Sequence, residues 1–268
     1  MSKISDILVI DDEQVVSDAV KKICALENYT VDVASNVTVA KEKLAKNYYD
    51  MIICDIMMPD GDGFMILDEL RDKKIDSTVI MTTGYSTVEN AVNSLYKGAV
   101  DFVPKPFTVD ELLNSIFHAN KYQKLKEKQK QLSLQNLNDE ILYVTCPAKY
   151  SRLGYSTWMY QEREGSVIVG VCDLFIKTID TISEIEMQNV DEEIAQGNCC
   201  ASFKSGDEKI HKAHAPVSGR IVEVNENLKL NPNLIEKDPY FEGWIYRVIP
   251  ANIDYEIKYL IPCSSDRI

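Results

Sequence analysis

The sequence predicts an α/β doubly wound domain followed by a mainly β domain. In the first 120 residues, short apolar strands alternate with segments long enough for crossover helices. Four of the five strands are continuous or nearly continuous apolar runs, which is typical of a parallel sheet covered on both faces. After about residue 145 the helical pattern stops, and short strands punctuated by glycine and proline follow.

Five β/α units account for the first domain. Its predicted helices span roughly 13–26, 37–47, 63–73 and 86–97, and a fifth begins at a capping box formed by Thr108 and Glu111. Units of this length fit a sheet of flavodoxin-like order, whose ligand site lies at the carboxyl ends of the strands. The predicted strands are Ile7–Ile10, Val31–Ala34, Met51–Cys54, Thr78–Met81 and Phe102–Val103.

A lysine-rich segment follows the fifth helix. Residues 121–130 contain five lysines and one glutamate, and neither proline nor glycine occurs between Pro106 and Pro147. This pattern predicts a helical connector over 121–145 between domains at 1–120 and 146–268. Because Tyr122, Leu125 and Leu132 share a helical spacing, a dimerising coiled coil is left open as an alternative.

Composition limits the classes of function. The net charge is −13 and the isoelectric point about 4.8, which does not suit a protein that grips phosphate backbones, although it leaves room for a local basic patch. No apolar run approaches the roughly 18 residues that span a bilayer. The chain enters a strand pattern at once, without a signal peptide, and its seven cysteines show no C-x-x-C spacing. We therefore expect a cytoplasmic protein with reduced thiols.

Acidic residues follow two of the predicted strands. Asp11 and Asp12 come after the first strand, and Asp55 comes after the third. If those strands are neighbours, the three carboxylates converge at one sheet edge and require a cation, for which Mg²⁺ is the natural choice. Thr83 and Lys105 follow the fourth and fifth strands at the same edge. The simpler alternative is that Asp11 and Asp12 only begin a helix.

These motifs together resemble receiver domains of two-component response regulators. The run from Asp50 to Gly61, then Thr82–Tyr85 and Gly98–Phe107, carry the resemblance, and residues 84–113 look most like receivers of the nitrogen-regulator type. The resemblance implies that a sensor histidine kinase is the partner, and it leaves open a homodimer through the fourth helix, fifth strand and fifth helix. It also implies roles for single residues: Asp55 as phosphoacceptor, Asp11, Asp12, Asp55 and the Met57 carbonyl as Mg²⁺ ligands, Lys105 as phosphate partner, and Thr83 with Phe102 as the switch pair.

The second half resembles the H protein of the glycine cleavage system, a lipoyl carrier of barrel-sandwich hybrid fold. The resemblance covers 150–252. It rests on the segments Ala215–Gly219, Ile221–Asn225, Asn231–Ile235, Asp238–Tyr240 and Gly243–Tyr246. We therefore expect the fold of such a carrier in this domain.

The lipoyl-lysine motif of that family is altered here. A carrier needs a lysine within Glu-Ser-x-Lys, eight residues before the proline, but the eighth residue before Pro216 is Glu208. Lys209 is the nearest candidate and Lys204 a more distant one, and neither has the motif around it. We expect no lipoate. His211 and His214, three residues apart on a strand, point to opposite faces and do not predict a shared metal site.

The sequence thus predicts a response regulator whose second domain acts by binding another protein. It predicts no enzyme activity beyond the receiver's own phosphorylation and hydrolysis. A phosphorylation-controlled lipoyl carrier is the first alternative. A transcription regulator is the second, although no helix-turn-helix, zinc ligand set or basic recognition helix follows the receiver-like segment.

Overall fold

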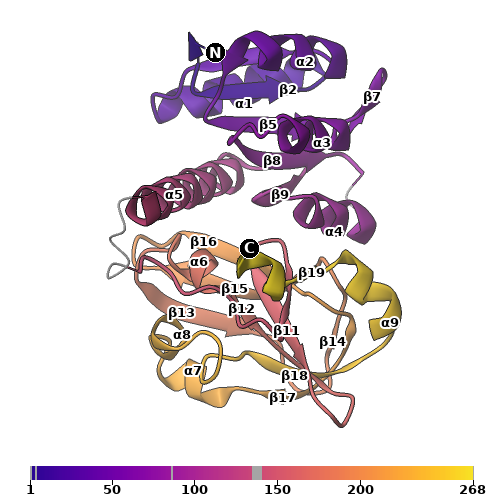
Figure 1. Cartoon of the computed structure of the whole chain (residues 1–268), viewed down its shortest axis with the longest axis vertical. Helices are drawn as coiled ribbons and strands as arrows, with labels where there is room; N and C mark the ends of the chain where they lie inside the picture. Colours follow the sequence, from indigo (N-terminus) through magenta and orange to yellow (C-terminus); the bar gives the residue numbers. More distant parts are fainter. Residues whose placement is uncertain (1, 4, 86, 135–140, 268) are drawn as a thin grey trace. The chain divides into compact units, whose positions relative to one another are not determined.

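The computed structural model describes residues 2–3, 5–85, 87–134 and 141–267. The chain forms two compact units (Figure 1). The first comprises residues 1–90 and 97–123, and the second comprises residues 91–96 and 124–268.

A five-stranded parallel sheet forms the centre of the first unit, in the order β3-β2-β5-β8-β9. All residues of β2, β5 and β8 are buried, as expected for parallel strands covered on both faces. The order confirms the predicted doubly wound, flavodoxin-like class. The strands are β2 (Ile7–Ile10), β3 (Val31–Ala34), β5 (Met51–Asp55), β8 (Thr78–Thr83) and β9 (Asp101–Pro104).

Helices connect these strands and flank the sheet (Figure 1). Two short ladders supplement it: β1 (Ser2–Lys3) pairs with β4 (Asn47–Tyr48), and β6 (Met57–Met58) pairs with β7 (Gly61–Asp62). The helices are α1 (Gln14–Leu26), α2 (Val37–Lys46), α3 (Phe64–Asp72), α4 (Val88–Tyr96) and α5 (Val109–Leu134).

The start of α5 contains the predicted capping box. The Glu111 amide donates to the Thr108 hydroxyl at 3.2 Å, and the Thr108 amide donates to the Glu111 carboxylate at 3.0 Å. The helix continues through the lysine-rich segment to Leu134. Residues 135–140 of the predicted connector lie outside the described residues. Residues 141–145 form neither helix nor strand, so the helical prediction does not hold for that stretch.

The second unit is mainly β, as predicted, with two antiparallel sheets. A seven-stranded sheet has the order β14-β17-β18-β12-β11-β10-β19, and a three-stranded sheet has the order β13-β15-β16. The first is built from β10 (Ser151–Leu153), β11 (Thr157–Gln161), β12 (Val167–Val171), β14 (Glu193–Ile194), β17 (Gly219–Val224), β18 (Tyr246–Pro250) and β19 (Ile261–Pro262). The second is built from β13 (Ile182–Met187), β15 (Cys199–Ser205) and β16 (Ile210–His214).

Short helices and a dense aromatic core complete this unit. Trp158 on β11 lies opposite Gly170 on β12, and a Cβ atom at position 170 would come within 2.4 Å of the indole ring. Glycine at position 170 therefore leaves room for the indole ring against the neighbouring strand. The helices are α6 (Asp173–Ile176), α7 (Glu226–Leu230), α8 (Leu234–Lys237), α9 (Ile253–Glu256), and the 3₁₀ helices η1 (Ile257–Tyr259) and η2 (Cys263–Arg267).

Across the described residues, we find no helix with the length and apolar character needed to span a bilayer.

Candidate functional site

Three carboxylates meet at the carboxyl edge of the first sheet. Asp11 directly follows β2 and Asp55 ends β5, and these strands are hydrogen-bonded neighbours with Ile10 opposite Cys54. One carboxylate oxygen from each of Asp11, Asp12 and Asp55 lies within 4.8 Å of the others. Asp11 and Asp55 are buried, whereas Asp12 is exposed. The adjacency of the two strands produces the convergence that the sequence predicts.

Lys105 brings a positive charge into this cluster. Its Nζ lies 2.8 Å from Asp11 Oδ2 and 2.6 Å from Asp55 Oδ2. Burial disfavours the ammonium form, yet the hydrogen bonds to both carboxylates outweigh this effect and raise the pKa of Lys105. Burial also raises the pKa of Asp11, although its hydrogen bond with Lys105 acts in the opposite direction. The lysine is therefore charged at neutral pH.

The donor set suits a hard divalent cation. Three carboxylates outnumber the single ammonium, so the site keeps excess negative charge when all groups are ionised. Carboxylate oxygens are preferred ligands of Mg²⁺, which retains several waters and tolerates an open side such as that beside Asp12. The geometry accordingly fits the predicted metal.

The loop after Asp55 folds back on β5. The Met57 amide donates to Asp55 Oδ1 at 3.2 Å, and the Gly63 amide donates to the Ile56 carbonyl at 2.8 Å. A Cβ atom at position 63 would lie 2.0 Å from the Asp55 carbonyl oxygen, so this close approach requires glycine. The fold-back places the backbone of Met57 beside the carboxylate cluster.

Thr83 and Phe102 lie on neighbouring strands. Thr83 ends β8 and is fully buried, and its hydroxyl accepts a hydrogen bond from the Tyr85 amide at 3.1 Å. The Lys105 amide donates to the Thr83 carbonyl at 2.8 Å, and this hydrogen bond joins the residue after β9 to the end of β8. Phe102 lies on β9 opposite Met81 and is also buried. The predicted switch pair thus lies on neighbouring strands, and Lys105 directly follows β9, the strand that carries Phe102.

The hairpin between β15 and β16 contains the altered lipoyl position. The Ser205 amide donates to the Lys209 carbonyl and the Glu208 amide to the Ser205 carbonyl, both at 2.9 Å. Glu208 lies within the turn with a φ of 64°, a left-handed conformation. Lys209 follows the turn, and its Nζ lies 2.6 Å from Asp207 Oδ2. This hydrogen bond lowers the pKa of Asp207 to about 2.

The two histidines of β16 differ in their burial. His211 is buried, and His214 is half-buried with its Nδ1 2.9 Å from the Gly197 carbonyl. Among the described residues, the only potential metal-ligand cluster of three or more side chains is the acidic one.

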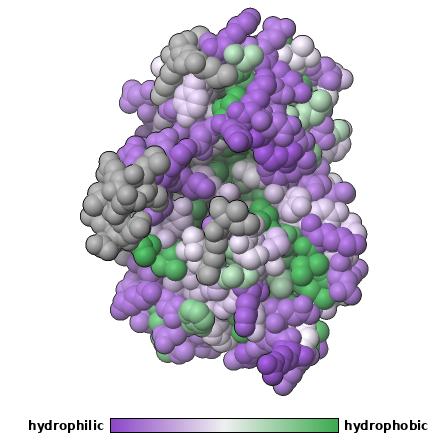
Figure 2. Space-filling view, in the orientation of Figure 1, coloured by the Kyte–Doolittle hydropathy of each residue, from purple (hydrophilic) through white to green (hydrophobic). Residues whose placement is uncertain are grey.

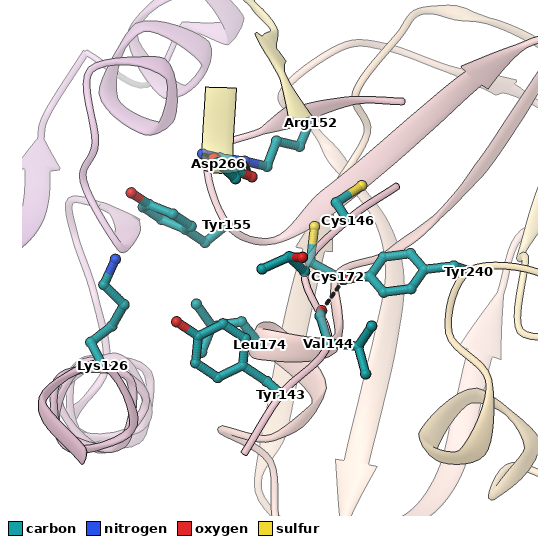
Figure 3. A pocket seen from close by; sticks show the side chains of 11 residues that line it. Lys126, Tyr143, Val144, Cys146, Arg152, Tyr155, Cys172, Leu174, Tyr240 and Asp266 are labelled. Atoms are coloured by element: carbon teal, nitrogen blue, oxygen red, sulfur yellow. Dashed lines mark hydrogen bonds and ion pairs between the residues drawn. The ribbon is translucent and has the colours of Figure 1, made fainter. Parts of the chain in front are cut away.

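The second unit contains a cavity of about 180 Å³ that the sequence did not predict (Figure 3). Buried Arg152 donates from Nε and Nη2 to Asp266 at 2.9 and 2.6 Å, across 114 residues of sequence. The charge of this arginine is therefore balanced inside the protein. Residues that line the cavity include Tyr143, Arg152, Tyr155, Cys172, Tyr240 and Asp266.

Three thiols lie together beside this cavity. Cys146, Cys172 and Cys263 belong to one buried cluster with Trp158 and Tyr240. Side-chain hydrogen bonds with the other two thiols, together with burial, raise the pKa of Cys146. A buried thiol with a raised pKa is a poor nucleophile, so we assign this cluster to packing.

Both halves match known families. Residues 7–117 match the response regulator receiver domain, and residues 149–263 match the glycine cleavage H-protein. The regulatory protein AtoC of Escherichia coli (strain K12) is 36% identical over 128 residues, which cover 48% of this chain and 28% of AtoC. A probable glycine cleavage system H protein of Thermococcus gammatolerans is 35% identical over 108 residues, which cover 40% of this chain and 79% of that protein.

A solved structure and a second regulator extend the comparison. The beryllofluoride-activated NtrC4 receiver domain dimer is 37% identical, with a TM-score of 0.41, and the match covers 42% of this chain and 93% of that one. The chain spans 28% of AtoC and 49% of the transcriptional regulatory protein DltR of Streptococcus agalactiae, about half or less of each regulator. The chain combines a response regulator receiver domain over residues 7–117 with a glycine cleavage H-protein domain over residues 149–263, and through the second it belongs to the glycine cleavage H-protein family.

Proposed function

We propose that this chain is a response regulator that accepts a phosphoryl group on Asp55 from a sensor histidine kinase, and that its second domain acts by binding another protein. The receiver covers 1–120, the connector 121–145 and the H-protein-like domain 146–268. One observation carries the first part: Asp55 Oδ2 lies 2.6 Å from the Lys105 ammonium, within a cluster of three carboxylates.

Asp55 is the nucleophile in this scheme. A carboxylate oxygen of Asp55 attacks phosphorus as the bond between phosphorus and the kinase histidine breaks, and the histidine leaves with the bonding electron pair. Lys105 contacts Asp55 before the reaction. As negative charge develops on the transferred phosphoryl oxygens, the Lys105 ammonium contacts those oxygens and stabilises the charge. Asp11, Asp12, Asp55 and the Met57 carbonyl would hold a Mg²⁺ ion, which would supply further charge neutralisation.

Thr83 and Phe102 transmit the change. In this proposal the Thr83 hydroxyl exchanges its hydrogen bond with the Tyr85 amide for one with the phosphoryl group. The loop after β8 then moves toward Asp55, and the ring of Phe102 repacks with it, which alters the surface formed by α4, β9 and α5. A homodimer through that surface is one form the output can take.

Phosphorylation by a small phosphodonor tests the receiver assignment. With Mg²⁺ present, the full chain should gain one phosphoryl group by intact mass, and Asp55→Asn should gain none. In Asp55→Asn the amide oxygen can still accept from the Met57 amide, but the ion pair between the carboxylate and Lys105 is lost. Labelling of Asp55 that survives complete removal of divalent metal would contradict the metal-assisted scheme.

The second domain retains the H-protein fold without the carrier lysine. Glu208 takes the place of the lysine eight residues before Pro216 and lies in the turn. The Lys209 amine forms an ion pair with Asp207 at 2.6 Å, so a carboxylate of the same hairpin already contacts it. We infer that this domain acts by protein–protein binding without lipoate, and with no enzyme activity beyond the receiver's own phosphorylation chemistry.

A phosphorylation-controlled lipoyl carrier is the second candidate. It is favoured by the 35% identity to an H protein and by the position of Lys209, one residue after the carrier position. Co-expression with lipoate ligase and ample lipoate, followed by intact mass, separates the two candidates. We expect no lipoyl group on the wild type. A lipoyl gain that is lost in Lys209→Arg and kept in Lys204→Arg would establish the carrier.

A further inference from the structure

The segment after Asp55 forms a two-rung hairpin. In the β6–β7 ladder, Met57 lies opposite Asp62 and Met58 opposite Gly61. Pro59 and Asp60 make the turn. The side chain of Met57 is 54% exposed, so the burial of that side chain contributes little to holding the hairpin in place.

The carboxylate of Asp60 binds the beginning of α2. It accepts from the Val37 amide at 3.1 Å, from the Thr38 amide at 3.0 Å and from the Thr38 hydroxyl at 2.9 Å. The first amides of a helix have no acceptor within the helix, and a negative charge at this end is favourable. Asn36 supplies the next acceptor, to the Val39 amide at 2.8 Å. The helix start is therefore satisfied jointly by its own cap and by the hairpin.

Asp60 keeps its charge at neutral pH. The hydrogen bond from the Thr38 amide lowers the pKa of its carboxyl group. An ionised carboxylate forms stronger hydrogen bonds to backbone amides than a neutral group does. The connection between the hairpin turn and α2 is thus charge-assisted.

The hairpin is anchored at two points. At its first residue, the Met57 amide donates to Asp55 Oδ1 at 3.2 Å. At its turn, Asp60 is bound to α2, 22 and 23 residues earlier in the sequence. The β6–β7 pairing joins these anchors, so the backbone of Met57 is positioned from both sides.

We propose that Asp60 is a positioning residue for the cation site, which fixes the Met57 carbonyl beside the carboxylates by tying the hairpin turn to α2. This inference rests on the proposed function, in which that carbonyl binds Mg²⁺. Groups outside the ligand set commonly orient metal ligands, and their removal costs roughly 10- to 100-fold in metal affinity. Asp60 holds a backbone ligand rather than a side chain, so we expect a loss near the lower limit.

The test compares Mg²⁺ dependence among full-length variants. Asp60→Ala removes all three hydrogen bonds, Asp60→Asn keeps the shape without the charge, and Thr38→Val removes only the hydroxyl bond. Asp72→Ala removes one charge from an exposed residue at the end of α3 and serves as the control. Phosphorylation rate is measured against Mg²⁺ concentration, Mg²⁺ binding by calorimetry, and unfolding by heat.

Asp60→Ala should raise the Mg²⁺ concentration for half-maximal rate roughly tenfold, with the rate at saturating Mg²⁺ within about twofold of wild type. Asp60→Asn and Thr38→Val should show smaller shifts in the same direction, and Asp72→Ala none. The losses of Mg²⁺ affinity measured by calorimetry should rank the variants in the same order. A shift in the Mg²⁺ concentration for half-maximal rate, with a nearly unchanged rate at saturating Mg²⁺, distinguishes a positioning role from a purely structural one.

An unchanged Mg²⁺ dependence in Asp60→Ala, with a lower melting temperature alone, would overturn the proposal and leave Asp60 as a helix cap. A lower saturating rate with unchanged half-saturation would overturn it as well. If Asp60→Ala fails to fold, wild-type Mg²⁺ binding by both Asp60→Asn and Thr38→Val would overturn it. A wild type that binds Mg²⁺ without becoming phosphorylated would refute the proposed function, while calorimetry would still decide whether Asp60 positions the ligand.

Discussion

Lys105 makes the stability of the metal-free receiver depend on pH. Its pKa is raised above the ordinary 10.5 in the folded chain, so its contribution is fully present below about pH 10.5 and is lost as pH rises through the higher folded value. Lys105→Met leaves two buried carboxylates without their cation. We expect it to lower the free energy of unfolding at neutral pH by on the order of 3 kcal/mol.

Urea unfolding across pH, with a chelator present, measures this effect. The difference between wild type and Lys105→Met should shrink above pH 10.5. Lys97→Met, which removes a more exposed lysine paired with Asp68 at 3.0 Å, is the matched control and should cost less. A difference between wild type and Lys105→Met that stays constant at alkaline pH would contradict the assigned ion pairs.

From the side chains of Met57 and Tyr85 we expect slow hydrolysis of the phosphoryl group on Asp55. Hydrolysis needs a water aligned with phosphorus, usually by a polar side chain near the site. Met57 and Tyr85, two residues beyond Asp55 and Thr83, offer neither an amide nor a carboxylate, and both are exposed. Met57→Asn should speed hydrolysis roughly tenfold, which corresponds to about 1.4 kcal/mol of barrier.

The decay of phosphorylated protein, followed by intact mass, checks this prediction. Met65→Asn places the same amide on an exposed methionine of α3 and should leave the decay unchanged. Loss of the phosphoryl group from the isolated wild type within seconds would show that another group aligns the water.

Among the secondary-structure elements, α5 depends on its capping box. Thr108→Ala removes the acceptor for the Glu111 amide and should lower the free energy of unfolding of the receiver by about 1 kcal/mol. Thr108→Ser keeps the hydroxyl and should retain most of that stability. Denaturant unfolding of the three proteins gives the comparison, and equal losses for alanine and serine would assign the effect to the lost methyl group.

The sequence specified the elements that have strong local patterns. Continuous apolar runs predicted the parallel strands, and Thr108 with Glu111 predicted the start of α5. Asp11, Asp12, Asp55 and Lys105 could be placed together because the carboxyl ends of neighbouring parallel strands meet at one edge. In each case the sequence pattern that allows the prediction spans only a few neighbouring residues, or the prediction follows from the order of the strands in the sheet.

Other features depend on partners that no local pattern identifies. Asp60 looks like an ordinary turn residue after Pro59, because its partners Val37 and Thr38 lie 23 and 22 residues away, respectively. The pair between Arg152 and Asp266 spans 114 residues. The two-residue strands β14 and β19 are set by their neighbours in the sheet rather than by periodicity. Such long-range pairings require the folded chain.

At the scale of the whole molecule, we expect the connector to transmit the effect of phosphorylation toward the second domain. Helix α5 runs without interruption from Val109 through the lysine-rich segment to Leu134. A change on the surface formed by α4, β9 and α5 should therefore alter amide exchange over 121–130 when Asp55 is phosphorylated. Hydrogen exchange of wild type and Asp55→Asn, each with and without phosphodonor, measures this. Identical exchange in all four samples would indicate two independent domains on a passive tether.

We propose that phosphorylation of Asp55 controls the binding of another protein by the second domain. The most direct measurement is affinity capture with the full chain, comparing wild type and Asp55→Asn with and without a phosphodonor and Mg²⁺. We expect the bound proteins to differ between phosphorylated and unphosphorylated wild type, and Asp55→Asn to match the unphosphorylated pattern in both conditions. The same bound proteins in all four samples would contradict the account.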